Sequence, residues 1–90
     1  MADYWTKDPD AVLDWHFDWI NWLDQGEVIT TSTFDVTAGI AVNATENTTS
    51  NTTVWLAGGR AGQNYQVTNR IITSAARTDE RSIIIRVRDR

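Results

Sequence analysis

The sequence predicts an all-β fold, an immunoglobulin-like antiparallel β-sandwich of six or seven short strands with an irregular N-terminal arm. Two observations support this class. Apolar and polar residues alternate with a period of two, and the alternating segments recur roughly every ten residues between polar turns. The chain has 90 residues, enough for one domain. We expect residues 1–10, which mix charges with two aromatics and the only proline, to be the arm, and residues 11–90 to be the sandwich.

The first predicted strand covers residues 13–19, where the alternation is strict. Its apolar face would comprise Leu13, Trp15, Phe17 and Trp19. Trp15, Trp19 and Trp22 also lie at helical spacing, but the aromatic content favours a strand. After the strand we expect a short helical turn over residues 19–23, with Asp18 as its N-cap and Gly26 at its end.

The middle of the chain supplies shorter strands. Residues 27–36 are rich in β-branched and aromatic side chains, which predicts a second strand, and residues 40–42 can begin a third. Residues 43–53 are polar and rich in Thr and Asn, so we expect a loop or an exposed sheet edge there. Residues 54–56 form a short apolar strand that should stop at the glycine-rich segment 57–62.

The clearest strands are residues 65–74 and 81–88, which the polar link AARTDE would join into a hairpin. Their inward face would comprise Tyr65, Val67, Ile71, Ile83, Ile85 and Val87. Tyr65 follows the glycine-rich corner, so two interpretations remain open. Its hydroxyl could close that corner, or its ring could be plain core.

Charge is distributed unevenly along the chain, whose net charge is -4. Residues 1–27 carry seven acidic side chains against Lys7 alone, whereas residues 60–90 carry seven arginines against three acidic side chains. The acidic end could dock on a basic partner or on a second copy, or the two segments could be neighbours that neutralise each other. No apolar run approaches the roughly 18 residues that span a membrane, so no membrane partner is expected.

Two groups of side chains are candidates for protein interfaces. Tyr4 and Trp5 on the arm are large amphipathic groups of a kind enriched at interfaces, although they could also cover their own domain. The second group lies on the outward face of the predicted hairpin and comprises Arg70, Ile72, Ile84, Arg86 and Arg88. If Ile72 and Ile84 are uncovered, they mark an apolar strip for a neighbouring chain; otherwise the arm or arginine stems cover them.

Nothing in the sequence favours catalysis, a cofactor or a metal. The chain lacks cysteine, and no nucleophile turn or phosphate loop is present. His16 lies between Asp14 and Asp18, a weak hint of a metal site or an acid/base group. The hairpin arginines could suggest nucleic acid, but the sequence pI of 4.6 argues against that partner.

The chain also contains three spaced blocks: KDPDAVLDWHFDW-x-x-WL at 7–23, VWLAGG at 54–59 and G-x-x-Y-x-VTNRI-x-TSA-x-RTDERS at 62–82. In these blocks it resembles the small tailed-bacteriophage proteins known as fiber-tail adaptors or virion structural proteins, which are immunoglobulin-like. Where those proteins have a TSAGR-like turn, this chain has Ala76 in place of the glycine. Because alanine adopts positive φ only at a cost, we expect a different loop conformation here.

The resemblance implies a non-enzymatic virion protein that is assembled in the bacterial host cytoplasm. It would link tail and fiber, or head and tail, through contacts with other phage proteins, in multiple symmetric copies. The partners could be tail, fiber, portal-proximal or capsid proteins. One alternative is a capsid decoration protein on the phage head. An alternative of another class is a carbohydrate- or host-binding module that uses exposed tryptophans and residues 43–53.

Overall fold

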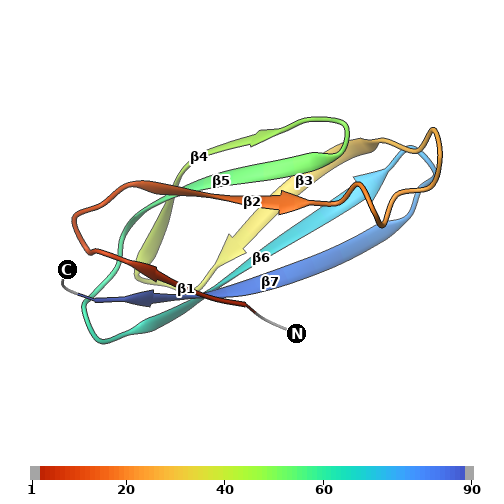
Figure 1. Cartoon of the computed structure of the whole chain (residues 1–90). Coiled ribbons are helices and arrows are strands. Elements are labelled where there is room, and N and C mark those ends of the chain that lie inside the picture. Colours follow the sequence, from red (N-terminus) through yellow and green to blue (C-terminus); the bar gives the residue numbers. More distant parts are fainter. Residues whose placement is uncertain (1–2, 89–90) are drawn as a thin grey trace.

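The structure is a computed structural model that describes residues 3–88, with side chains from residue 5 onward. Within this range seven strands and no helix form two sheets (Figure 1). The strands are β1 (Asp3–Lys7), β2 (Leu13–Asp18), β3 (Ile29–Val36), β4 (Ile40–Asn47), β5 (Asn51–Gly58), β6 (Asn64–Thr73) and β7 (Thr78–Val87). None of the described residues belongs to a helix that could cross a membrane.

The strands are ordered β1-β7-β6-β3 in a four-stranded sheet and β2-β5-β4 in a three-stranded sheet. The chain changes sheet after β1, β2, β3 and β5, whereas β4–β5 and β6–β7 are hairpins within one sheet. The two sheets stack as the layers of a sandwich (Figure 1). All pairings are antiparallel except that of β1 with β7, which is parallel. The predicted immunoglobulin-like β-sandwich is therefore confirmed.

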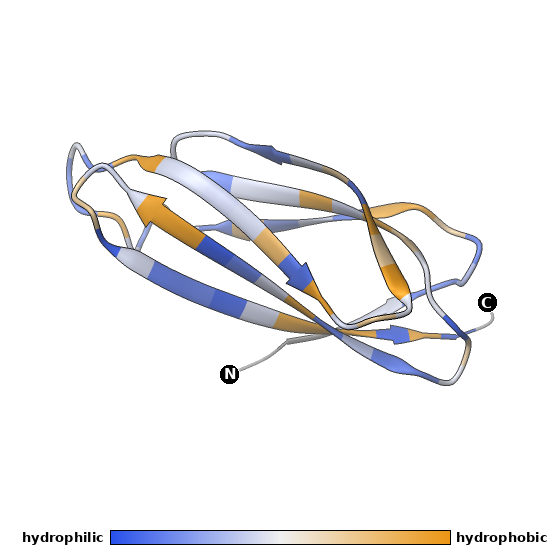
Figure 2. Ribbon diagram, turned by 180° about the vertical axis from the view of Figure 1, so that it is seen from behind, coloured by the Kyte–Doolittle hydropathy of each residue, from blue (hydrophilic) through white to orange (hydrophobic). Residues whose placement is uncertain are grey.

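The core lies between the sheets because each inner strand buries every second residue. In β6 and β7, the predicted inward residues are all buried, and Figure 2 shows hydrophobic bands alternating with hydrophilic ones along the strands. Ile29 comes from β3 of the same sheet. The three-stranded sheet and the segment after β2 contribute Trp15, Phe17, Trp19, Ile40, Val54 and Leu56. Leu13 was expected on the buried face but is exposed. It lies at the first position of β2, where the core ends.

Tyr65 performs both of the roles considered for it. Its ring is buried, and its hydroxyl oxygen accepts a hydrogen bond of 2.9 Å from the backbone N–H of Arg60. Arg60 belongs to the glycine-rich connection between β5 and β6, so this bond ties the connection to the start of β6. This is the arrangement of a tyrosine corner.

A buried polar residue, Asn69 on β6, joins the two sheets. Its Oδ1 accepts hydrogen bonds from Trp19 Nε1 at 3.0 Å and from Thr52 Oγ1 at 2.7 Å. Its Nδ2 donates to Ser32 Oγ at 2.9 Å and to the Thr33 carbonyl at 3.0 Å. Asn69 is fully buried, and these four bonds satisfy its amide, which is why the core tolerates it.

The N-terminal arm is not irregular over residues 3–7, which form strand β1. These five residues pair with β7 from Asp3↔Ile83 to Lys7↔Val87. Lys7 is fully buried, and its Nζ donates to the carbonyls of Asp8 at 2.8 Å and Gly58 at 2.7 Å. The mixture of charges suggested a solvated arm, but the ammonium group finds carbonyl acceptors inside the protein and the strand covers an edge of β7.

The predicted short helical turn over residues 19–23 is present after β2 as a single turn. The Trp19 carbonyl accepts hydrogen bonds from the N–H groups of Trp22 and Leu23, at 2.9 and 3.1 Å, and no further helical bond follows. Asp18 does cap it, because its Oδ1 accepts the N–H of Ile20 at 3.0 Å. The buried Trp19 ring anchors this turn to the core.

Most of the polar segment 43–53 is strand rather than loop. β4 extends to Asn47 and β5 begins at Asn51, so only residues 48–50 connect them. Residues 43–47 are exposed at a sheet edge, as expected, but Thr52 and Thr53 are buried. Their hydroxyls bond to Asn69 and His16, and these partners offset the burial of polar groups.

The hairpin turn between β6 and β7 contradicts the expectation for Ala76, which adopts φ of +60°. Thr73 N–H donates to the Arg77 carbonyl at 2.9 Å, and Ala76 N–H donates to the Thr73 carbonyl at 2.9 Å. A three-residue hairpin loop closed in this way needs its last residue in the left-handed region. The loop length therefore imposes the conformation, and alanine accepts the strain.

Replacing Ala76 with glycine should stabilise the protein by about 1 kcal/mol, because glycine adopts this φ without steric cost. Urea denaturation followed by tryptophan fluorescence would measure the change. Ala75→Gly in the same turn is the matched control, and it should be neutral or slightly destabilising because Ala75 is outside the positive-φ region. Equal shifts for the two variants would contradict the strain at Ala76.

Candidate functional site

The hairpin face, meaning the outward side of β6 and β7, carries five of the predicted interface residues. Arg70, Arg86 and Arg88 are exposed, Ile72 is 40% exposed and Ile84 is half-buried. Ile72 lies opposite Thr78, whereas Ile84 lies opposite Gln66. Six register positions, or about 20 Å, therefore separate the two isoleucines, and they do not form one apolar strip.

The two predicted arm residues lie on β1. Trp5 is 50% exposed and borders a groove between β1, β2 and β7, so the structure places it at an accessible surface. The backbone of Tyr4 pairs with Ile84, and its side chain lies outside the described residues.

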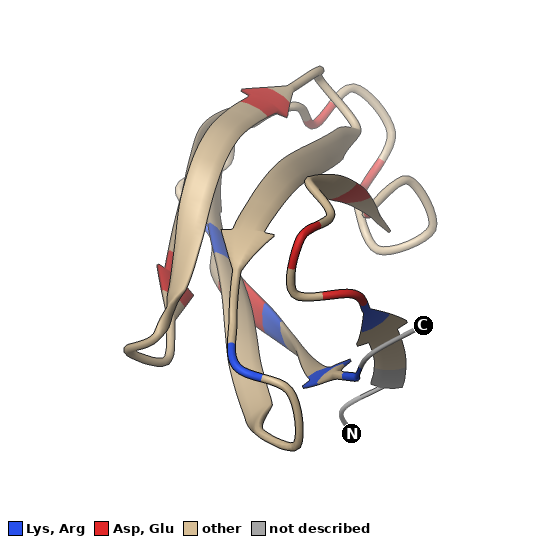
Figure 3. Cartoon of the chain, turned by 90° about the vertical axis from the view of Figure 1, so that its left-hand side faces the viewer, with Lys and Arg blue, Asp and Glu red and all other residues tan. Residues whose placement is uncertain are grey.

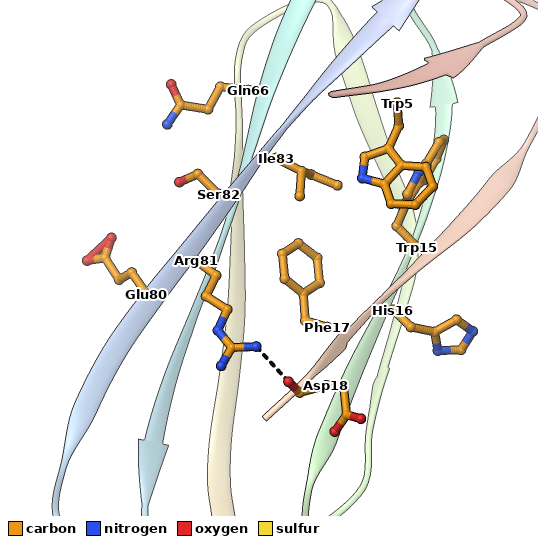
Figure 4. A pocket seen from close by; sticks show the side chains of 10 residues that line it. All are labelled: Trp5, Trp15, His16, Phe17, Asp18, Gln66, Glu80, Arg81, Ser82 and Ile83. Carbon is orange, nitrogen blue, oxygen red and sulfur yellow. Dashed lines mark hydrogen bonds between the residues drawn. The ribbon is translucent and has the colours of Figure 1, made fainter. Parts of the chain in front are cut away.

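The groove beside Trp5, called here the β2 groove, has a volume of about 650 Å³. Its apolar lining consists of Trp5 from β1, Trp15 and Phe17 from β2, and Ile83 from β7 (Figure 4). Arg81 reaches across one end, where its guanidinium donates a hydrogen bond of 2.6 Å to the Asp18 carbonyl. A second hollow of about 430 Å³ adjoins the groove and shares Trp5 and Trp15.

His16 does not build a metal site with its acidic neighbours. Its Nε2 lies 3.2 Å from Asp14 Oδ2, and its Nδ1 lies 2.7 Å from Thr53 Oγ1. Among the described residues, no three metal-ligating side chains are grouped so that they could hold an ion. The imidazole instead links β2 to β5 through Thr53, at the border of the β2 groove (Figure 4).

An ion-pair cluster at the hairpin end of the sandwich was not predicted from the sequence. Arg77 Nε donates to Glu27 Oε2 at 2.9 Å, and a second guanidinium nitrogen bonds to Glu27 Oε1. The Arg77 guanidinium also lies 4.1 Å from the centre of the Trp22 ring and 3.8 Å from Asp24 Oδ2. At this end, the acidic and basic segments of the chain neutralise each other.

These contacts stabilise the charged form of Glu27, and they lower its pKa from the ordinary 4.5 to about 2. The hydrogen bond from Arg77 is the largest cause, followed by hydrogen bonds from the Thr73 hydroxyl and the Asp24 N–H. The cluster ties the turn after β2 to the hairpin turn, since Glu27 and Arg77 are 50 residues apart.

Stability should therefore fall as the pH drops from about 4.5 to about 2, because the unfolded chain takes up the Glu27 proton at a higher pH than the folded chain. At pH values above about 4.5, the contribution of ionised Glu27 to the free energy of unfolding is fully present. Urea midpoints measured across it should decline more steeply for the native chain than for Glu27→Gln, which has no proton to bind. Parallel declines would contradict the assigned role of Glu27, because the remaining acidic residues are common to both chains.

The fold and these surfaces define a class of protein: an immunoglobulin-like β-sandwich whose accessible features are a basic sheet face, exposed sheet edges and an apolar groove. Figure 3 shows basic positions near the end of β7 and acidic positions along β2 and the segment before it. Such surfaces are typical of domains that bind other proteins.

The model of the family described as "Podophage GP4 fiber-tail adaptor protein gp77" matches residues 7–86. The chain belongs to this family. No curated protein matches the chain. The match covers all three blocks on which the resemblance was based, and family membership places the chain among structural proteins of the phage tail.

Proposed function

We propose that this chain is a non-enzymatic adaptor of the virion, which joins fiber and tail components through protein contacts alone. The family match over residues 7–86 supports this role. The proposal also includes assembly in the host cytoplasm and incorporation in multiple symmetric copies. Multiple copies are proposed because a marginally stable small domain gains stability from neighbouring chains.

The hairpin face is the proposed docking surface for one partner. Arg86 near the end of β7 and Arg88 just after it lie at one end of this face. Arg70 lies six register positions away from Arg86, with its Nε 4.0 Å from Glu80 Oε1. Arginine is enriched at interfaces because its planar group forms paired hydrogen bonds with carboxylates. Ile72 adds exposed apolar surface near the hairpin turn. An acidic partner surface would complement this face.

The two alternatives receive no specific support. Of the five tryptophans, all of which are described, only Trp5 is among the exposed large hydrophobic residues, and residues 43–53 belong mainly to strands. A carbohydrate-binding module that uses several exposed rings is therefore not favoured. Nothing in the structure points to the capsid surface either.

Purified particles provide the test. The chain should fractionate with detached tails, and a variant that combines Arg70→Glu, Arg86→Glu and Arg88→Glu should be incorporated about tenfold less, because like charges would then meet at the interface. Arg60→Glu, at an exposed position on the connection between β5 and β6, is the single-charge control and should be incorporated normally. A copy number that follows the major capsid protein would overturn the adaptor role in favour of capsid decoration.

A further inference from the structure

Strand β2 is an open edge of the three-stranded sheet, since β5 is its only partner among the described residues. Trp19 N–H donates to the Ser50 carbonyl at 2.9 Å, and this bond continues the β2–β5 register. In an antiparallel ladder hydrogen-bonded positions alternate, so the odd-numbered residues of β2 bond to β5. The N–H and C=O groups of Asp14 and His16 therefore point away from β5, toward the open edge.

The open edge of β2 runs along the β2 groove. A strand added there would alternate its side chains, and every second one would point toward Trp15, Phe17, Ile83 and the exposed Trp5. These residues offer an apolar surface in a groove of about 650 Å³, which suits aliphatic or aromatic side chains. The remaining side chains of the added strand would lie on the outer face, beside those of Asp14, His16 and Asp18.

The outer face of β2 is acidic. Asp14 and Asp18 flank His16 there, and Asp8 and Asp10 precede the strand (Figure 3). Opposite charges on neighbouring strands stabilise a sheet, whereas like charges directly opposite each other destabilise it. Antiparallel pairing of β2 with the β2 of a second copy would bring these carboxylates together. The charge therefore favours a basic strand from another protein.

We propose that the open edge of β2 binds an extended segment of a partner virion protein, which adds as a fourth strand and alternates apolar residues with Lys or Arg. The inference rests on the proposed function, since an adaptor must hold a partner. The exposed Asp14 and His16 backbone groups provide main-chain hydrogen bonds, and the β2 groove and acidic face provide selectivity.

Short overlapping peptides from the tail and fiber proteins of the same virion are the probes, and the purified full chain is the receptor. The tightest binders should alternate apolar and basic residues. On binding, the amides of Asp14 and His16 should exchange hydrogen at least about tenfold more slowly, because they enter a ladder. The amide of Thr45 is the internal control. Thr48 N–H donates to the Asn51 carbonyl, so the even-numbered residues of the β4 end bond to β5. The amide of Thr45 therefore faces the open edge of β4, and its exchange rate should not change on peptide binding.

His16→Pro removes the outward N–H without breaking the β2–β5 ladder, and it should weaken peptide binding by about tenfold or more relative to His16→Ala. His16→Ala accounts for the loss of the imidazole bond to Thr53, and Thr45→Pro controls for proline on the other edge of the same sheet. A variant combining Asp14→Lys and Asp18→Lys keeps the backbone intact and should also lose the basic peptides. This second variant decides the outcome if His16→Pro does not fold.

Peptide binding without protection of the β2 amides, absence of any peptide binding, or binders without basic residues would overturn the inference. If the same amides become protected without peptide as the protein concentration rises, the edge binds a second copy of the chain instead. These results leave the adaptor role standing as long as the chain fractionates with tails. Absence of the chain from tails would overturn the proposed function separately.

Discussion

Replacing Asn69 with alanine is expected to lower the free energy of unfolding by about 3–5 kcal/mol. The substitution leaves Trp19 Nε1 and the Thr52 hydroxyl without their acceptor in the buried interior. It also removes the donor from the half-buried Ser32 hydroxyl and from the Thr33 carbonyl. Each polar group that loses its hydrogen-bond partner adds to the loss of stability. Since small domains are only marginally stable, much of the population would unfold near room temperature.

Urea denaturation followed by fluorescence would measure this loss, because the buried Trp19 ring reports directly on the site. Asn64→Ala is the matched control, since Asn64 is an exposed asparagine on the same strand, and its change should stay within about 0.5 kcal/mol. A loss below about 1 kcal/mol for Asn69→Ala would show that the network contributes little to folding.

Replacing Gly59 with alanine is expected to destabilise the protein by about 2–4 kcal/mol. Gly59 has φ of +94°, and a Cβ atom there would lie 2.6 Å from Val87 Cγ2 and 3.5 Å from Tyr65 Cε2. Val87 is buried, so it can move away only by disturbing the core. Backbone strain and steric overlap therefore add together at this corner.

Gly62→Ala separates these two causes. Gly62 lies in the same corner with φ of +89°, but a Cβ atom there would have no neighbour within 4 Å. This variant should introduce only backbone strain and should destabilise the protein by about 1–2 kcal/mol. Thermal unfolding of both variants would give the difference, and equal losses would mean that Val87 adjusts without cost.

Much of the fold could be predicted from alternation alone, because β2, β6 and β7 each bury one face and expose the other. Strand β1 could not be predicted in this way. Its only described buried residue is Lys7, and the burial of that ammonium depends on the carbonyl of Gly58, 51 residues away. Asn69 and Glu27 also read as surface residues, because the partners that satisfy them lie far along the chain.

The candidate site was predictable only as a face. Alternation correctly placed Ile72 and Ile84 on the face that points away from the core. A two-residue period does not show how far apart two residues lie along the length of a hairpin. The β2 groove could not be predicted either. It depends on where β1 and β2, which belong to different sheets, lie relative to each other in space.

The parallel pairing of β1 with β7 has a mechanical consequence. Tension between the start of β1 and the end of β7 pulls these strands in opposite directions along their length. The load then falls on the whole set of hydrogen bonds from Asp3↔Ile83 to Lys7↔Val87 at once, instead of opening them one after another. The buried Lys7 ammonium also ties the end of β1 to β5 through its bond to the Gly58 carbonyl. A member of a tail adaptor family could in this way transmit force from one end of its chain to the other without unfolding.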